Sequence, residues 1–164
     1  MGSAAPILAP ELPQAFRSAM RRLAATVGIV TARGPDGPVG MAATSIVSLT
    51  LEPPAVLVCV NRATSLHNCL VLDAPLSISI LSRHQRDVSR AFGGAIPCER
   101  RFEFGRWLDD ARGLPMLAEA QANLECTIAS LTPYGTHSIV IANVSAVLVS
   151  ELVAPLIYQD GDYL

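Results

Sequence analysis

Hydroxyl side chains stand at two positions where the sequence predicts the start of a helix, and arginines follow the second of them. Thr64 and Ser65 open one helical stretch, and Ser82 precedes another. Unpaired amides and the helix dipole favour an anion there, and arginine can bind phosphate through two parallel hydrogen bonds. Arg83 and Arg90 are therefore candidate partners for a phosphate-bearing ligand. The alternative stays open, because these hydroxyls could serve only as helix caps.

Common metal-binding and dinucleotide-binding motifs are missing from the sequence. It contains no C-x-x-C pair, and its histidines do not cluster with its cysteines, so no zinc site is expected. No G-x-G-x-x-G follows a strand, and Gly93-Gly94 comes after a predicted helix, which disfavours a Rossmann dinucleotide site. If a nucleotide binds this chain, another device must hold it.

Composition favours one compact domain that acts on small molecules. The 164 residues are 51% hydrophobic and 16% charged, and a net charge of -2 gives no electrostatic footprint for nucleic acid or an anionic membrane. We predict a flexible segment over residues 1–11 and a single domain over residues 12–164. The mean hydropathy of +0.40 suggests that some apolar surface is hidden against a partner, although a large core alone would give the same value. No signal peptide or membrane span is predicted, so we expect a cytoplasmic protein with reduced thiols.

Most of the predicted elements are strands. Apolar and β-branched runs bounded by Gly and Pro predict strands at residues 26–32, 39–44, 45–51, 55–60, 76–81, 122–131, 137–150 and 156–158. Gly34-Pro35-Asp36-Gly37 predicts a hairpin turn between the first two. The pattern indicates a β-dominated barrel with short helices, without alternating βαβ units.

Three short helices and one long loop complete the prediction. The spacing of apolar residues after Pro13 predicts an amphipathic helix over residues 13–23 that covers one side of the core. Residues 64–72 have helical character, and Ser82 with Gln85 forms a capping-box pattern before a helix over residues 83–92. Residues 93–115, rich in Gly, Pro and Arg, predict a long loop that covers a site or moves.

Many short segments in one fixed order give the chain a strong resemblance to the flavin reductase family, the reductase components of two-component flavin monooxygenases. The matching segments are residues 40–45, 48–54, 58–67, 77–82 with Gln85, 89–92, 101–102 before Trp107, 135–139, and 155–158 with Tyr163. They extend over nearly the whole chain, which makes a chance match a poor explanation.

The resemblance implies a fold, an activity and partners. The expected fold is an FMN-binding split β-barrel, usually a homodimer, in which NADH or NADPH reduces FMN or FAD. The reduced flavin would then reach a separate monooxygenase by diffusion. Hydride transfer between two cofactors requires mainly that their rings be stacked at reactive distance, so the absence of a catalytic triad fits. The sequence does not choose between FMN and FAD, or between NADH and NADPH.

The resemblance also implies which residues form the site. His137 is the expected catalytic residue, near the nicotinamide and the flavin ring. Small side chains after Gly40 would let a strand approach the flat flavin ring. The implied flavin-binding residues are Met41, Ala42, Ala43, Thr44, Ser45, Ser48, Asn61, Thr64, Ser65, His67, Ser82, Arg83, Gln85, Arg90, Phe92 and Tyr158. The loop of residues 93–115 is expected to cover the nicotinamide.

Three residues depart from the family pattern, and two other functions stay open. Ala42 stands where a threonine is usual, Thr44 where many members have asparagine, and Thr136 where an acidic residue precedes the histidine. One alternative is an FMN-dependent oxidase related to pyridoxamine phosphate oxidases, which consumes no nicotinamide. The other is a non-catalytic protein that binds flavin or haem on the same scaffold.

Overall fold

The computed structural model describes residues 11–164, which are built around a seven-stranded antiparallel sheet. In sheet order its strands are β3 (Gly37–Ala43), β2 (Gly28–Gly34), β6 (Pro75–Ile80), β9 (Ala122–Tyr134), β10 (His137–Val149), β5 (Pro54–Asn61) and β4 (Ile46–Leu51). The predicted strands are confirmed. Apart from Glu11, the segment predicted to be flexible, residues 1–11, lies outside the described residues.

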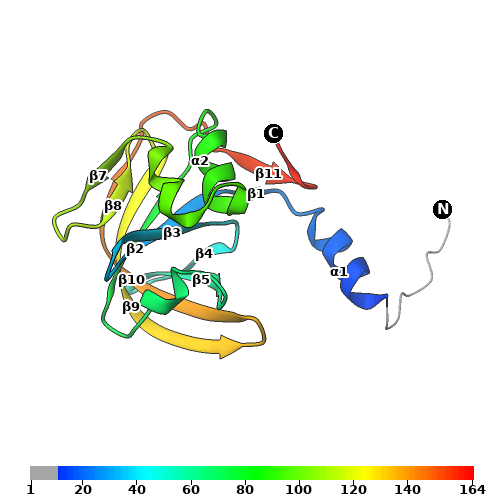
Figure 1. Ribbon diagram of the computed structural model, residues 1–164, viewed down its shortest axis with the longest axis horizontal. Coiled ribbons are helices and arrows are strands. Elements are labelled where there is room, and N and C mark those ends of the chain that lie inside the picture. The colour runs from blue at the N-terminus through cyan, green and yellow to red at the C-terminus, as the bar shows by residue number, and fades with distance from the viewer. Residues whose placement is uncertain (1–10) are drawn as a thin grey trace.

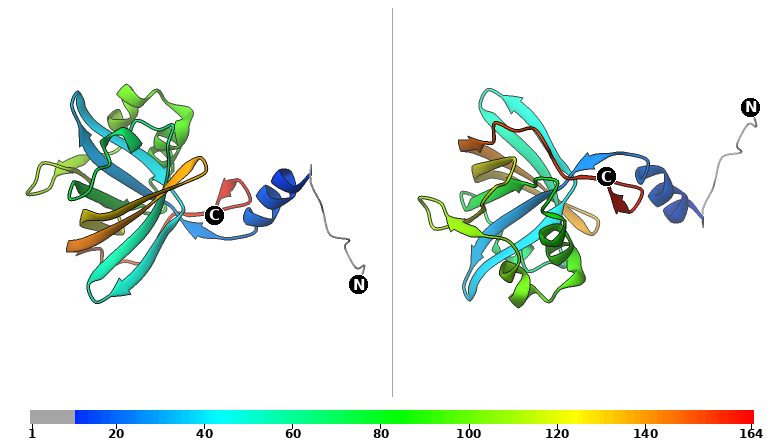
Figure 2. Two further views of the ribbon diagram at one scale, coloured as in Figure 1. Left: turned by 90° about the horizontal axis from the view of Figure 1, so that it is seen from below. Right: turned by 90° about the horizontal axis from the view of Figure 1, so that it is seen from above.

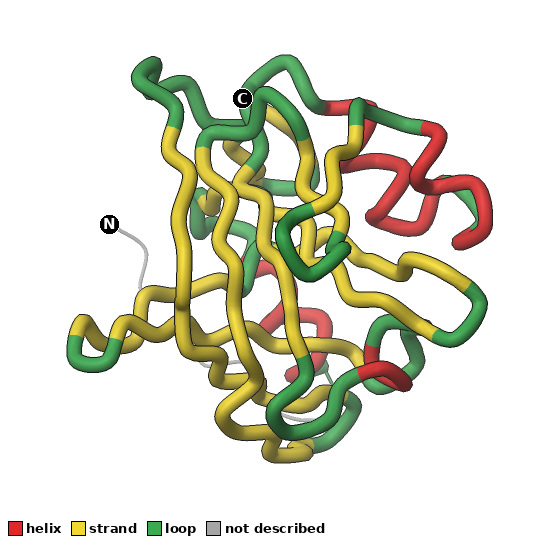
Figure 3. Tube along the Cα trace, turned by 90° about the vertical axis from the view of Figure 1, so that its left-hand side faces the viewer, coloured by secondary structure: helices red, strands yellow, loops and turns green. Residues whose placement is uncertain are grey.

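The sheet curls round without closing and forms a split barrel (Figures 1 and 2). Its edge strands are β3 and β4, and β3 approaches β5 across the opening. Within the described residues β3 is hydrogen-bonded to β2 alone, so backbone amides and carbonyls along its other edge have no strand partner. Figure 3 shows the long strands lying side by side across the curved sheet.

Two smaller sheets flank the barrel. The first joins β1 (Ala25–Thr26), β11 (Ile157–Gln159) and β12 (Asp162–Tyr163), and so brings the segment that follows the N-terminal helix beside the C-terminal hairpin. The second joins β7 (Trp107–Asp109) and β8 (Pro115–Leu117). The prediction of a single long loop over residues 93–115 is therefore wrong, because Trp107 packs against Phe92 and Phe102 and orders this segment.

The predicted hairpin turn is confirmed, and it sets the register of β2 and β3. Gly34 pairs with Gly37, whose φ of +133° is a conformation that favours glycine. Continuing this register places Ala42 opposite Ile29 and Ala43 opposite Gly28. The hairpin thus fixes the position of the small-residue stretch along the barrel wall.

Strand alternation divides the apolar residues between two cores. Val30, Val58 and Ile128 fill the barrel interior, while Ile29 and Phe92 belong to a second cluster under the helices. Neighbouring residues of one strand point to opposite faces, so Ile29 and Val30 serve different cores. Both faces of the central strands are therefore buried.

The N-terminal helix forms as predicted, but its predicted contact with the core is wrong. Helix α1 (Leu12–Met20) has no buried residue and stands apart from the barrel (Figure 1). The chain after it is held elsewhere, because Arg21 and Arg22 accept hydrogen bonds from Asp160 N–H and the Gln159 side chain. Among residues 11–164, no helix combines the length and apolar character needed to cross a membrane.

The helix predicted over residues 64–72 is wrong. Only one 3₁₀ turn, η1 (His67–Cys69), forms there. Leu66 and Leu70 are buried in the barrel core, so one turn suffices to seat both side chains. Asp73 then adopts a φ of 64°, a left-handed conformation that a continuing helix cannot accommodate.

The second helix is shorter than predicted. Helix α2 (Arg86–Arg90) begins after Gln85 and continues into a wide turn, η2 (Ala91–Ala95), and a 3₁₀ helix, η3 (Cys98–Glu103), follows. Half of the capping box forms, because Ser82 N–H donates to Gln85 Oε1 at 2.9 Å. The Ser82 hydroxyl does not cap the helix and donates to the carbonyl of Glu119.

Burial of Cys126 gives the fold a dependence on alkaline pH. Desolvation raises the pKa of this thiol to about 12 from 9.0. The unfolded chain loses the proton near pH 9 while the folded chain keeps it, so stability falls by about 1.4 kcal/mol per pH unit between these values. In urea unfolding, the wild type should lose about 2 kcal/mol more than Cys126→Ala between pH 8 and 10.5. A pH-independent difference between the two proteins would contradict this assignment.

Candidate active site

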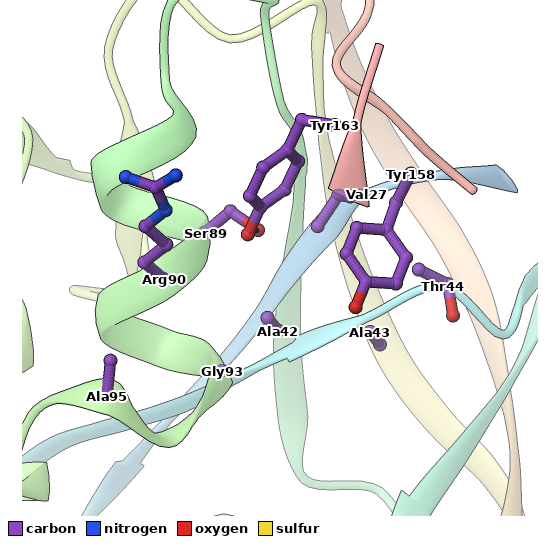
Figure 4. A pocket seen from close by; sticks show the side chains of 10 residues that line it. All are labelled: Val27, Ala42, Ala43, Thr44, Ser89, Arg90, Gly93, Ala95, Tyr158 and Tyr163. Atoms are coloured by element: carbon purple, nitrogen blue, oxygen red, sulfur yellow. Dashed lines mark hydrogen bonds between the residues drawn. The ribbon is translucent and has the colours of Figure 1, made fainter. Parts of the chain in front are cut away.

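A cavity of about 340 Å³ opens between β3, α2 and the C-terminal hairpin of β11 and β12. Figure 4 shows its small side chains on β3, with Tyr158 and Tyr163 reaching toward them from the hairpin. The lining residues are Val27, Ala42, Ala43, Thr44, Ser89, Arg90, Gly93, Ala95, Tyr158 and Tyr163. The cavity has a small-residue strand on one side and an aromatic wall on another, a shape suited to a flat ring.

Specific contacts hold the aromatic wall. The Tyr163 hydroxyl donates to Ser89 Oγ at 2.9 Å, which ties the hairpin to α2 (Figure 4). The Tyr158 and Tyr163 rings meet edge to face with centroids 5.3 Å apart. The Arg90 guanidinium lies 5.7 Å from the Tyr163 ring centroid, within range of a cation–π interaction. The wall is thus fixed by a hydrogen bond, ring packing and a positive charge.

The structure brings five of the predicted site residues together around this cavity: Ala42, Ala43, Thr44, Arg90 and Tyr158. The other five lining residues were not predicted as site residues: Val27, Ser89, Gly93, Ala95 and Tyr163. Ser89 and Tyr163 fall within the matching segments, so a signal for them was present in the sequence. Their hydrogen bond joins residues far apart in the chain, which local patterns do not reveal.

A second group of predicted residues lies in the turn after β5. Asn61 accepts a hydrogen bond from Ala63 N–H at 2.9 Å, and the Thr64 hydroxyl donates to the Asn61 carbonyl at 2.8 Å. His67 Nε2 and Ser138 Oγ are 2.9 Å apart. The Thr64 hydroxyl also lies 4.0 Å from Met41 Sδ, which places this turn beside β3. These contacts make the turn a rigid neighbour of the edge strand.

Ser65 lines a different cavity, of about 530 Å³, beside the β2–β3 turn. Two thiols share this second cavity, Cys69 and Cys98. Burial raises the pKa of Cys69, and a hydrogen bond to Glu99 raises that of Cys98. Both thiols are therefore protonated near neutral pH, and the cavity offers no thiolate nucleophile. The phosphate argument from a long helix dipole fails for Ser65, since only η1 follows it.

Ser45 and Ser48 lie on the side of β4 and β5. Ser45 Oγ is 3.3 Å from both the N–H and the carbonyl oxygen of Cys59, so it bridges to β5. Ser48 is exposed on the edge strand opposite Val56. Neither residue lines the cavity under the tyrosines.

Four predicted residues surround the start and end of α2, and three of them are buried and make contacts within the chain, while their flavin-binding role stays a prediction. Ser82 and Gln85 are buried, and Gln85 Nε2 donates to the Ala118 carbonyl at 2.8 Å. Phe92 is buried with its ring 5.0 Å from that of Phe102. Arg83 is exposed. The Ser82 hydroxyl, the Gln85 amide and the Phe92 ring thus hold α2 in place, and α2 carries Ser89 and Arg90.

His137 is exposed at the start of β10, opposite Asn61 of β5. Its Nδ1 lies 2.9 Å from the Thr136 hydroxyl, so a hydroxyl contacts the imidazole where the family pattern has an acidic residue. His137 does not line the cavity under the tyrosines. Its assignment as the catalytic residue stays a prediction.

The unclosed, curled sheet with a cavity beside its edge strand β3 is a split-barrel arrangement. Residues 20–164 match the family described as Flavin reductase like domain, and the chain belongs to this family. It is 38% identical over 164 residues to FMN reductase (NADH) RutF of Variovorax paradoxus, covering 99% of this chain and 89% of the relative. It is also 38% identical to the reductase component of FADH(2)-dependent resorcinol hydroxylase of a Rhizobium species, covering 95% and 89%.

A solved structure supports the same fold. The NADH:FAD oxidoreductase SgcE6 of Streptomyces globisporus, in complex with NAD and FAD fragments, matches with a TM-score of 0.87 at 28% identity. The match covers 98% of this chain and 96% of that one. The split-barrel prediction is therefore confirmed.

Proposed function

We propose that this chain is an NAD(P)H:flavin oxidoreductase that reduces FMN or FAD and supplies the reduced flavin to a separate monooxygenase. The observation that carries the proposal is the cavity between the small-residue end of β3 and the tyrosine wall, in a chain of the flavin reductase family. Relatives named as an FMN reductase (NADH) and as a hydroxylase reductase component support it.

The residues of the cavity fit a flavin. The small side chains of Ala42 and Ala43 would let a flat ring approach the backbone of β3 closely. The unpaired edge of β3 offers backbone donors and acceptors to the polar edge of the ring. Thr44 adds a hydroxyl at one end. Arg90 also lines the cavity, and its only ion pair in the described residues, with Asp87 at 3.9 Å, is long and exposed. Its guanidinium is therefore available to a phosphate group of the flavin.

The protein's part in the reaction is mainly orientation. A flavin supplies the hydride-accepting chemistry when it is bound. Tyr158 and Tyr163 would limit how a second ring stacks in the cavity, and the Ser89 hydroxyl fixes the angle of Tyr163. We assign a proton-donating role to His137 at the start of β10, with Thr136 Oγ1 setting which imidazole nitrogen carries the proton. Met41 on β3, Asn61 at the end of β5, and Thr64 and His67 in the segment after β5 would also hold the flavin.

The same proposal includes the organisation of the protein. We propose that residues 12–164 act as one domain and that two copies form a homodimer. Four cysteines without disulfides support a reducing, cytoplasmic setting. FMN or FAD and NADH or NADPH are its proposed substrates.

The test is the absorbance of NADH and of NADPH at 340 nm, measured with purified protein in the presence and absence of FMN, FAD or riboflavin. We expect loss of the signal only when flavin is added, and the pair with the highest kcat/KM identifies the substrates. Tightly retained flavin without nicotinamide turnover would instead support the oxidase, and flavin or haem binding without any turnover would support the binding protein. A heat-unfolded sample controls for non-enzymatic oxidation.

A further inference from the structure

The second cavity, of about 530 Å³, is larger than the cavity under the tyrosines and combines hydrogen-bonding groups with an aromatic ring. Asp36 and Glu99 bring carboxylates to it, and Asn68 brings a carboxamide. Phe102 brings a half-buried ring, which also packs against Phe92. None of the described residues that line this cavity is basic. Its size and lining suit a flat ring that carries an amino group.

The two cavities follow one another along the free edge of β3. Residues 37–40 line the second cavity, and residues 42–44 line the first. Because Gly34 and Gly37 flank a two-residue turn, they form a hydrogen-bonded pair, and every second residue after Gly37 bonds to β2 in the same way. The residues between them, which include Gly40 and Ala42, direct their backbone groups toward the free edge. One elongated ligand lying along this edge would therefore reach both cavities.

Arg101 of η3 lies between the two cavities. Its Nη1 donates at 3.1 Å to the carbonyl of Gly40, which lines the second cavity. Its Nε donates at 3.3 Å to the carbonyl of Ile96, the residue after Ala95 of the first cavity. Both acceptors are neutral, and no carboxylate within residues 11–164 forms an ion pair with this guanidinium. The positive charge is thus held in a fixed place and is available to a phosphate.

A second arginine stands at the near end of the first cavity. Figure 4 shows Arg90 at the opposite end of this cavity from Thr44. Because Thr44 follows the last residue of β3, the Arg90 end lies toward the start of β3, on the side of Arg101. Two cations in succession between two cavities match a pyrophosphate that joins two ring-bearing groups.

We propose that the second cavity binds the adenine ring of FAD, with the flavin ring in the first cavity and the pyrophosphate between Arg90 and Arg101. This inference rests on the proposed function and adds a preference for FAD over FMN, which has a single phosphate and no adenine. The Asn68 carboxamide would pair with the amino group and N7 of adenine, and Phe102 offers a ring for stacking. NADH also carries adenine, but the shared edge strand favours the nucleotide whose flavin ring lies on β3.

The first test compares kcat/KM for FAD with kcat/KM for FMN, from NADH oxidation at 340 nm. The wild type should favour FAD at least about 10-fold. Arg101→Gln and Asn68→Ala should each reduce this ratio at least about 5-fold, because each removes a contact that FMN does not make. Arg101→Lys keeps the charge and should recover part of the ratio. The matched controls, which should keep the wild-type ratio, are Arg100→Gln, whose side chain pairs with Glu103, and Asn143→Ala, which is exposed on β10.

Isothermal titration calorimetry with AMP tests the second cavity without the reaction, because AMP and FMN are the two halves of FAD. AMP should bind the wild type both alone and in the presence of saturating FMN, and saturating FAD should abolish this binding. Arg101→Gln and Asn68→Ala should each raise the Kd for AMP at least about 10-fold, whereas Arg100→Gln should not. The melting temperature of each variant shows whether it is folded.

Three results would overturn the inference. The first is equal kcat/KM for FAD and FMN in the wild type, and the second is AMP binding that is the same in the wild type and in folded Arg101→Gln and Asn68→Ala. The third is a raised KM for NADH in both variants with an unchanged ratio of FAD to FMN, because the adenine of NADH would then occupy the cavity.

The two tests also separate this inference from the proposed function. If AMP binds as expected but no flavin is reduced, the proposed function fails and the adenine site stands. If flavin is reduced without AMP binding and without a preference for FAD, the proposed function stands and the adenine site fails.

Discussion

Ala42→Leu is expected to lower kcat/KM for flavin at least about 100-fold, because a misplacement of about 1 Å between reacting groups can cost this much. The alanine methyl group lines the cavity of about 340 Å³, and three further carbon atoms would occupy the space proposed for the flavin ring. The measurement is NADH oxidation at 340 nm with varied FMN and FAD.

Ala111→Leu is the matched control for this prediction. Ala111 is exposed in a turn away from the cavity, so the same change in side chain should leave kcat/KM unchanged there. The melting temperatures of both variants show whether the fold is kept. Undiminished flavin reduction by a well-folded Ala42→Leu protein would place the flavin elsewhere.

Ile78→Ala is expected to have the largest effect on stability, a loss of about 2–5 kcal/mol in the free energy of unfolding. Ile78 is fully buried on β6, between β2 and β9, so its truncation leaves a cavity in the barrel core. Ile78→Val removes a single methylene and should cost about 0.5–1.5 kcal/mol. Urea denaturation measures both.

Val71→Ala provides the surface comparison for Ile78. Val71 is 61% exposed in the turn before β6, so truncation there should change stability by less than about 0.5 kcal/mol. Equal losses at the two positions would mean that β6 does not lie at the centre of the core.

Local sequence patterns predicted the strands well because alternation and turn residues act over a few positions. The Gly34–Gly37 turn and the apolar run of β6 are examples. The same patterns could not place α1, since helical spacing shows that a face is apolar but not what covers it. They also overestimated the helix after Thr64, where one turn already buries Leu66 and Leu70.

The cavity was only partly predictable for a different reason. Ala42, Thr44 and Tyr158 lie in segments that resemble the family, and the structure brings them together. Ser82 and Gln85 have side chains that suit either a ligand or a structural bond, and only the tertiary structure reveals their hydrogen bonds to Glu119 and Ala118. Tyr163 is held at the cavity by a hydrogen bond to Ser89. The two residues lie far apart in the sequence, so local patterns do not predict this bond.

The small sheet that carries the tyrosine wall has a consequence for the order of folding. Its first pairing joins Ala25 to Tyr158, so almost the whole chain forms the loop that this contact closes. Contacts of such long range carry a high closure entropy, which the two residue pairs of β1 and β11 offset only together with further hydrogen bonds, among them the bond between Tyr163 and Ser89. We therefore expect the wall to be among the last parts of the chain to assemble.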